Sequence, residues 1–138
     1  PALIPEDYLP DVHSRLIMYK RISSASDTEA LDDLQVEMID RFGMLPPSLK
    51  RLFLVTALKQ KAELFGIKKI ESGIHSGSIQ FSQTTNVDPE CIISLVQGSP
   101  KLYKLVSAHR LSFSFSSDNP DFQLNFVCDI LEKLRLNN

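Results

Sequence analysis

The hydrophobic pattern of this chain changes near Gly66, and that change limits the folds open to it. Before Gly66, apolar residues recur at helical spacing, whereas residues 110–116 alternate between apolar side chains and serines. Helical spacing predicts helices with one buried face, and strict alternation predicts strands with one buried face and one wet face. The sequence therefore predicts an α+β fold in which a helical N-terminal half precedes a sheet.

Three helices are predicted before the change. Asp11 is the expected N-cap of the first helix, which runs to about residue 23. Ser26 and Glu29 match a capping box that opens the second helix, and Gly43 is its expected left-handed C-cap. The expected apolar stripe of the first helix consists of Val12, Leu16, Ile17, Tyr19 and Ile22.

Pro46-Pro47 opens the third helix, because proline is tolerated in the first turn. Its first part is apolar on nearly every side, which is typical of a centrally buried helix. Beyond Gly66 we expect a small, mainly antiparallel sheet of about four strands with two further helices packed on it. The strands are predicted at residues 67–71, 78–82, 102–106 and 110–116. The last helix is expected to turn inward Phe122, Phe126, Ile130 and Leu134.

The length of 138 residues and the net charge of −2 suit one globular domain. No apolar run approaches the roughly 18 residues of a membrane helix, so we expect a cytoplasmic protein without a membrane partner. The chain has no start methionine, and we expect residues 1–138 to be one domain cut from a longer protein. Cys91 and Cys128 are expected to be buried thiols, with a disulfide as the alternative.

No catalytic, cofactor-binding or metal-binding residues are predicted. The five glycines fit turns or caps rather than a phosphate-binding loop. His13, His75 and His109 lie far apart, and no cysteine or serine nucleophile stands at an interpretable spacing from them. We therefore expect no enzymatic activity from this chain alone.

Charge is unevenly distributed along the chain. Residues 1–42 contain nine acids against four bases, whereas residues 50–69 contain six bases against Glu63 alone. Such a basic segment is usually a solvated helix face, although it offers possible phosphate contacts. The six candidate contacts are Lys50, Arg51, Lys59, Lys61, Lys68 and Lys69.

Three charged residues near the end of the second helix form the candidate functional site. Glu37, Asp40 and Arg41 share one face by their i, i+3 and i+4 spacing, and the apolar residues of the helix use the other face. Glu37 and Arg41 also suit an ordinary surface ion pair. Arg15 is either a surface residue or the partner of an acid on the second helix.

Residues 3–46 resemble the TRCF domain, the C-terminal domain of bacterial transcription-repair coupling factor, Mfd. The matching segments are Leu3-Ile4-Pro5-Glu6-Asp7-Tyr8-Leu9-Pro10-Asp11, Arg15-Leu16, Tyr19-Lys20-Arg21-Ile22, Glu37-Met38-Ile39-Asp40-Arg41-Phe42-Gly43 and Leu45-Pro46. The resemblance implies a parent that is an ATP-driven DNA translocase, which releases stalled RNA polymerase and recruits UvrA for excision repair. It implies that this domain is a non-catalytic regulator that packs against the UvrB-like, UvrA-binding module, masks it and restrains the motor.

On this interpretation Glu37 and Asp40 meet basic residues of the UvrA-binding module. Arg41 orients the two acids or forms a reciprocal pair. Two other roles stay open: a nucleic-acid accessory domain that uses the basic segment at 50–69, and a purely structural domain.

Overall fold

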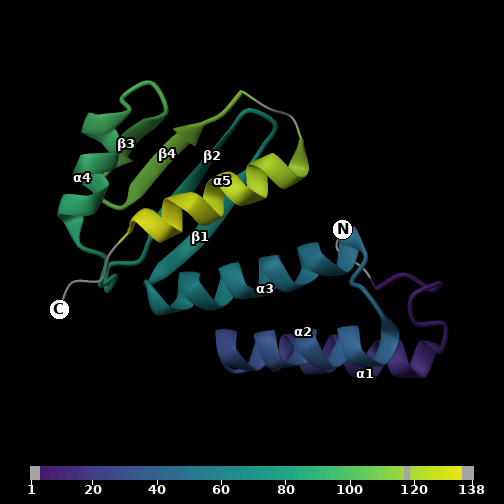
Figure 1. The fold of residues 1–138 in the computed structure, drawn as a ribbon. Helices are drawn as coiled ribbons and strands as arrows, with labels where there is room; N and C mark the ends of the chain where they lie inside the picture. Colours follow the sequence, from purple (N-terminus) through teal and green to yellow (C-terminus); the bar gives the residue numbers. More distant parts are fainter. Residues whose placement is uncertain (1–3, 117–118, 135–138) are drawn as a thin grey trace. The chain divides into compact units, whose positions relative to one another are not determined.

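The computed structural model describes residues 4–116 and 119–134, and Figure 1 shows their helices and strands. The chain divides into two compact units, with the boundary between Gln60 and Lys61. The elements are α1 (Val12–Ser23), α2 (Thr28–Phe42), α3 (Pro47–Leu64), β1 (Ile67–Ser72), β2 (Ser76–Phe81), α4 (Pro89–Gly98), β3 (Tyr103–Ser107), β4 (Arg110–Ser114) and α5 (Pro120–Lys133). Within the described residues, three helices precede a four-stranded sheet with two further helices, which confirms the predicted α+β class. That residues 1–138 act as one regulatory domain stays a prediction.

The first two helices begin at aspartate caps. Asp11 accepts a hydrogen bond from the backbone N–H of Ser14, which confirms the predicted cap. The cap of α2 is Asp27, which accepts from the N–H of Ala30, so the capping box predicted at Ser26 is wrong by one residue. Aspartate and serine both satisfy the free N–H groups of a first turn, and the carboxylate adds a charge that the helix N-terminus favours.

The C-terminal end of α2 is held by glycine and tyrosine. Gly43 has a φ of 97°, a value that favours glycine and confirms the predicted cap, and its N–H donates to the carbonyl oxygen of Ile39 at 2.9 Å. The hydroxyl of Tyr8 donates to the carbonyl oxygen of Gly43 at 2.9 Å and lies 3.2 Å from that of Met38. The Tyr8 ring meets Phe42 edge-on, with ring centroids 6.1 Å apart. The N-terminal segment thereby fixes the point where α2 ends.

Arg15 holds the same N-terminal segment to α1. Its Nη1 donates to the carbonyl oxygens of Leu9 and Pro10 at 2.8 and 2.9 Å, and its Nη2 lies 4.0 Å from Glu6. The alternative in which Arg15 pairs with an acid of α2 is therefore wrong. Arg15 instead donates hydrogen bonds to two backbone carbonyl oxygens of the turn before α1, which are not paired within a helix.

The arginine that does reach α2 is Arg21. Its Nη1 and Nη2 donate to the two carboxylate oxygens of Glu37 at 2.5 and 2.8 Å. A guanidinium matches a carboxylate in this two-pronged geometry, which restricts the relative position of α1 and α2. The hydrogen bond from Arg21, supported by one from Arg41, lowers the pKa of Glu37 from 4.5 to about 2.

One apolar cluster forms the core of the first unit. Its buried members are Ile4, Leu9, Met18, Ile22, Leu31, Leu34, Met38, Leu45, Leu49 and Phe53. Ile22 was predicted to face the core, but Val12 and Leu16 are 59% and 61% exposed, so the predicted stripe of α1 is only partly right. The helix is rotated so that Met18 and Ile22 face the core.

The third helix is not buried on every side. Leu49 and Phe53 are buried, whereas Leu54 and Leu64 are exposed. A helix that is apolar all round is buried only where other elements surround it. The prediction of a centrally buried α3 is therefore wrong for these two leucines.

The strands pair antiparallel in the order β1-β2-β4-β3. In the middle of the sheet, Leu111 of β4 lies opposite Ile79 of β2 and Leu105 of β3. Leu111, Phe113 and Phe115 are all buried, which confirms the predicted alternation along this segment.

Helix α5 covers the apolar face of the sheet (Figure 1). The ring centroid of Phe126 lies 5.7 Å from the ring centroid of Phe113 and 6.1 Å from that of Tyr103. Ile130 and Leu134 are buried as predicted, but Phe122 is 45% exposed, so its predicted inward position is wrong. Phe122 lies in the first turn of α5, where its ring centroid is 6.4 Å from that of Phe115. Two further residues on the buried face of α5, Val127 and Leu131, were not predicted from the sequence.

Neither cysteine forms a disulfide. Cys91 is buried in α4, which confirms one of the two predicted buried thiols, and Cys128 is half-buried in α5. Burial raises the pKa of Cys128. Among the described residues, no helix combines the length and the hydropathy needed to cross a membrane.

We expect Gly77→Ala to destabilise the protein by about 1–3 kcal/mol, because a methyl group there overpacks the sheet. A Cβ at Gly77 would lie 2.3 Å from the carbonyl oxygen of Glu71 and 2.6 Å from Cζ of Phe113. Gly98→Ala is the matched control, since no heavy atom lies within 4 Å of its added Cβ. Urea unfolding of both variants measures the difference, and equal midpoints would contradict the packing described here.

We expect the stability advantage of the wild type over Glu37→Gln to depend on pH. The folded pKa of Glu37 is about 2 against an ordinary value of 4.5, so the charged carboxylate stabilises the folded state. The advantage is fully present above about pH 5 and decreases as the pH falls toward about 2. Urea unfolding across this range checks it. In the Arg21→Met background the same substitution should show a much smaller pH dependence, and an unchanged dependence would contradict the pairing.

Candidate protein-interaction surface

The predicted charged trio lies on the last two turns of α2. Asp40 and Arg41 are exposed, and Glu37 is half-buried. The structure does place the three on neighbouring turns of one helix, but it gives them different surroundings.

Glu37 is engaged within the domain. Both of its carboxylate oxygens accept hydrogen bonds from Arg21, and Oε2 also accepts from Nη1 of Arg41 at 3.1 Å. Its charge is thus largely compensated by two arginines. A carboxylate in this position orients its neighbours more readily than it binds a new cation.

Arg41 is held but still open to solvent. Its guanidinium contacts Glu37 on one side and lies over the Phe42 ring, 4.8 Å from the ring centroid. Its side chain is 54% exposed. These two contacts restrict the direction in which Arg41 points, so less conformational entropy is lost when a partner binds it.

Asp40 is the charged residue of the trio with the least internal engagement. Within residues 4–116 and 119–134 it has no ion-pair partner. Beside Glu37 and Arg41, exposed apolar residues also lie on this part of the helix: Val36, one turn earlier, is 59% exposed, and Ile39 is also exposed. Met44, just beyond the helix, is 76% exposed.

We call this set of residues the α2 surface; it consists of Val36, Ile39, Asp40, Arg41 and Met44. Protein interfaces commonly combine exposed apolar side chains and arginine with a polar rim, whereas a simple solvated face is polar throughout. The apolar members of the α2 surface were not predicted from the sequence. The signal was present, because Val36 lies off the Leu31–Leu34–Met38 stripe that faces the core.

The basic segment predicted for phosphate contacts does not belong to one unit. Lys50, Arg51 and Lys59 lie in the first unit, and Lys61, Lys68 and Lys69 lie in the second. Lys61 and Lys69 are engaged by acids: Nζ of Lys61 lies 2.6 Å from Glu132, and Nζ of Lys69 lies 2.9 Å from Glu71.

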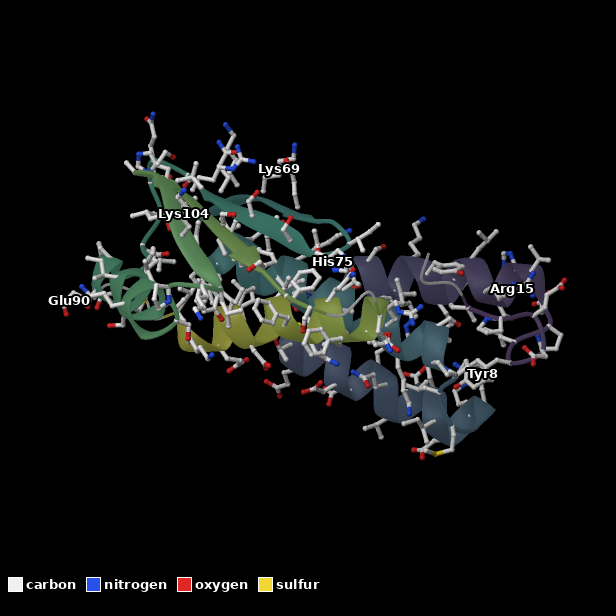
Figure 2. All side chains as sticks on the ribbon, turned by 90° about the horizontal axis from the view of Figure 1, so that it is seen from above. Tyr8, Arg15, Lys69, His75, Glu90 and Lys104 are labelled. Atoms are coloured by element: carbon white, nitrogen blue, oxygen red, sulfur yellow. The ribbon has the colours of Figure 1, made fainter. Side chains whose placement is uncertain are left out.

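A metal centre has no support in the described part of the chain. There, no group of three or more histidine, cysteine, aspartate or glutamate side chains is arranged to hold an ion. His13 and His109 are exposed, as is His75, which Figure 2 labels near the turn between β1 and β2. The geometry of the α2 surface is suited to contact with another protein surface.

Comparison with known proteins connects this domain to one family. The family model of the TRCF domain matches residues 1–92. The transcription-repair-coupling factor of Haemophilus influenzae is 39% identical over 134 residues, which cover 97% of this chain and 12% of that protein. The corresponding factor of Escherichia coli K12 is 36% identical over 137 residues, which cover 99% of this chain and 12% of that protein. The chain thus spans about an eighth of the length of these relatives.

A solved structure has the same fold. The crystal structure of the C-terminal domain of a transcription-repair coupling factor superposes with a TM-score of 0.79 and covers 96% of this chain and 85% of that one, at 20% sequence identity. At that identity the match supports the fold, and the sequence matches support the relationship. The chain therefore belongs to the TRCF domain family of transcription-repair coupling factors.

Proposed function

We propose that this chain is a non-catalytic autoregulatory domain of a transcription-repair coupling factor. In this proposal it packs against the UvrB-like, UvrA-binding module of its parent, masks that module and restrains the motor until the parent engages RNA polymerase. The α2 surface is the contact. UvrA and RNA polymerase are indirect partners, DNA is reached through the motor of the parent, and the setting is the cytoplasm.

The observation that carries the proposal is the juxtaposition of Asp40 and Arg41 with exposed apolar side chains at the end of α2. An apolar contact supplies affinity, and opposite charges in defined positions supply specificity. A domain tethered to its partner has a high effective concentration, so a small interface is enough to hold it. Such a contact also releases when a competing partner binds.

The internal pairs suggest separate roles within the trio. Asp40 would meet a basic residue of the UvrA-binding module, and Arg41 would meet an acid. Glu37 would act as a positioning residue, because Arg21 fixes it to α1 and it in turn orients Arg41. This division refines the initial hypothesis, in which Glu37 contacted the partner directly.

We expect Asp40→Ala and Arg41→Ala, placed in a full-length coupling factor carrying this domain, each to raise UvrA affinity by about fivefold or more. Loss of one interfacial charge weakens the closed state and exposes the masked module. UvrA pull-down titration and the ATPase rate measure the two consequences. Glu63→Ala, which removes an exposed acid outside α2, is the control and should change neither.

Two outcomes would contradict the assignment. If both α2 variants leave UvrA affinity and ATPase rate unchanged, the α2 surface does not mask the module. If deletion of the whole domain destabilises the parent without activating it, the domain has a structural role instead.

We also expect Val36→Ser and Met44→Ser to release the parent, because each removes apolar area from the proposed interface. Both side chains are exposed, so the isolated domain should keep its unfolding midpoint. UvrA binding and thermal unfolding, measured on the same variants, separate the two effects. Release caused only by unfolding of the domain would count against the interface.

A further inference from the structure

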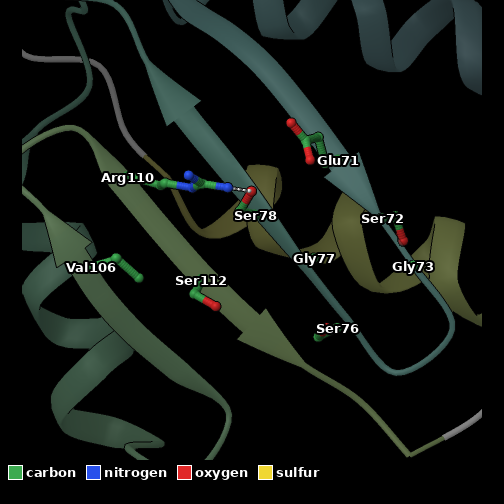
Figure 3. Close-up of a pocket in the computed structure, with 9 residues that line it drawn as sticks. All are labelled: Glu71, Ser72, Gly73, Ser76, Gly77, Ser78, Val106, Arg110 and Ser112. Carbon is green, nitrogen blue, oxygen red and sulfur yellow. Dashed lines mark hydrogen bonds between the residues drawn. The ribbon is translucent and has the colours of Figure 1, made fainter.

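The outward face of the sheet is a second surface, distinct in chemistry from the α2 surface. Alternation along the strands turns Ile79, Leu111 and Phe113 toward α5, so Ser78 and Ser112 face the other side. Figure 3 looks onto this side, with α5 behind the sheet. Here polar side chains replace the apolar ones.

A shallow hollow of about 530 Å³ lies on this face. Four serines, Glu71, Val106 and Arg110 line it, and Nη2 of Arg110 donates to Oγ of Ser78 at 3.3 Å. Hydroxyl groups and a guanidinium are the donors that bind phosphate oxygens without reading a base sequence.

Charge in the second unit is divided between its strands and its helices. The outward side chains of the strands include Lys69, Lys104 and Arg110 against one acid, Glu71. In Figure 2, Lys69 and Lys104 both lie on the strands, on the side away from α5. The acids of α4 and α5 are Glu90, Asp121, Asp129 and Glu132. An anion is therefore attracted to the strand side of this unit.

The spacing of these bases suits a run of phosphates. Lys69 lies on β1 and Lys104 on β3, the two edge strands, and Arg110 lies between them on β4. Three strand spacings separate the edges by about 14 Å. With one phosphate per about 3.4 Å of axis along each strand of a duplex, this width covers about four phosphates of one strand.

The face is suited to double-stranded rather than single-stranded nucleic acid. Unpaired bases are bound by stacking on aromatic side chains. Within the described strands, the aromatic residues Phe81, Tyr103 and Phe113 are buried with the core, and the outward positions carry none. A duplex keeps its bases stacked and presents only phosphate and sugar.

We propose that the outward face of the sheet binds the phosphate backbone of duplex DNA, with Arg110 at the centre and Lys69 and Lys104 at the edges. Glu71 weakens the attraction, and it shares Lys69 through their 2.9 Å ion pair. This role is independent of the masking function, because it uses other residues and another partner.

Fluorescence anisotropy of this chain with a labelled duplex, measured over a series of salt concentrations, tests the proposal. Three phosphate contacts predict a slope of log K against log salt of about −2.7, and Arg110→Gln should reduce its magnitude by about 1. Lys104→Gln should act similarly. Glu71→Gln should strengthen binding, which a variant that merely damages the fold would not do.

Lys59→Gln is the charge-matched control, since it removes an exposed lysine of α3 outside the sheet. It should leave binding unchanged, and so should Asp40→Ala of the α2 surface. The proposal is overturned if Arg110→Gln binds with the wild-type slope while circular dichroism shows it folded. Tighter binding of a single strand than of the duplex also overturns it, as does equally effective competition by polyglutamate, which would indicate an acidic protein partner.

Discussion

The small size of each compact unit is the constraint on which the rest of this structure depends. A unit of 60 to 80 residues buries only about 60% of the surface that its unfolded chain exposes, so each helix and strand can turn only one face inward. In the first unit this leaves Val12, Leu16 and Val36 in solvent although they lie on amphipathic helices. In the second unit it leaves the serine and arginine side of the sheet uncovered. The outward faces are therefore where partners can bind.

Much of the sequence motif that is shared with the family has a folding role. Tyr8 ties the N-terminal segment to the end of α2, Arg15 satisfies carbonyl groups before α1, and Arg21 pairs with Glu37 across the two helices. These contacts define the path of the chain around α2. What they leave exposed, Asp40 and Arg41 with Val36 and Met44 beside them, is the part of the motif available to a partner. A motif of this kind thus combines residues that stabilise the fold with a smaller number of exposed residues that a partner can contact.

The fold class and the element order could be predicted because they depend on local patterns. The alternation at Leu111, Phe113 and Phe115 and the cap at Asp11 need only neighbouring residues. How elements distant in sequence rotate against one another decides whether Leu16 and Phe122 are exposed. It also decides that Arg21, and not Arg15, reaches an acid of α2. Helical spacing permits several such rotations. For the candidate site, the sequence indicated the charged residues. The hydrogen bonds of Glu37 with Arg21 and the exposed apolar residues near Asp40 became visible only in the structure.

The two exposed surfaces differ in a way that affects how they would respond to salt. The α2 surface combines one acid, one arginine and apolar area, and apolar burial is insensitive to moderate salt. The sheet face has hydroxyls and bases beside a smaller apolar contribution from Val106, so the charged part of any affinity for phosphate there falls steeply as salt rises. Masking would consequently persist at ionic strengths where a duplex has already left the sheet face. In the proposed function, a domain with both surfaces would hold its parent closed without DNA bound, and charge alone would separately adjust its proposed contact with DNA.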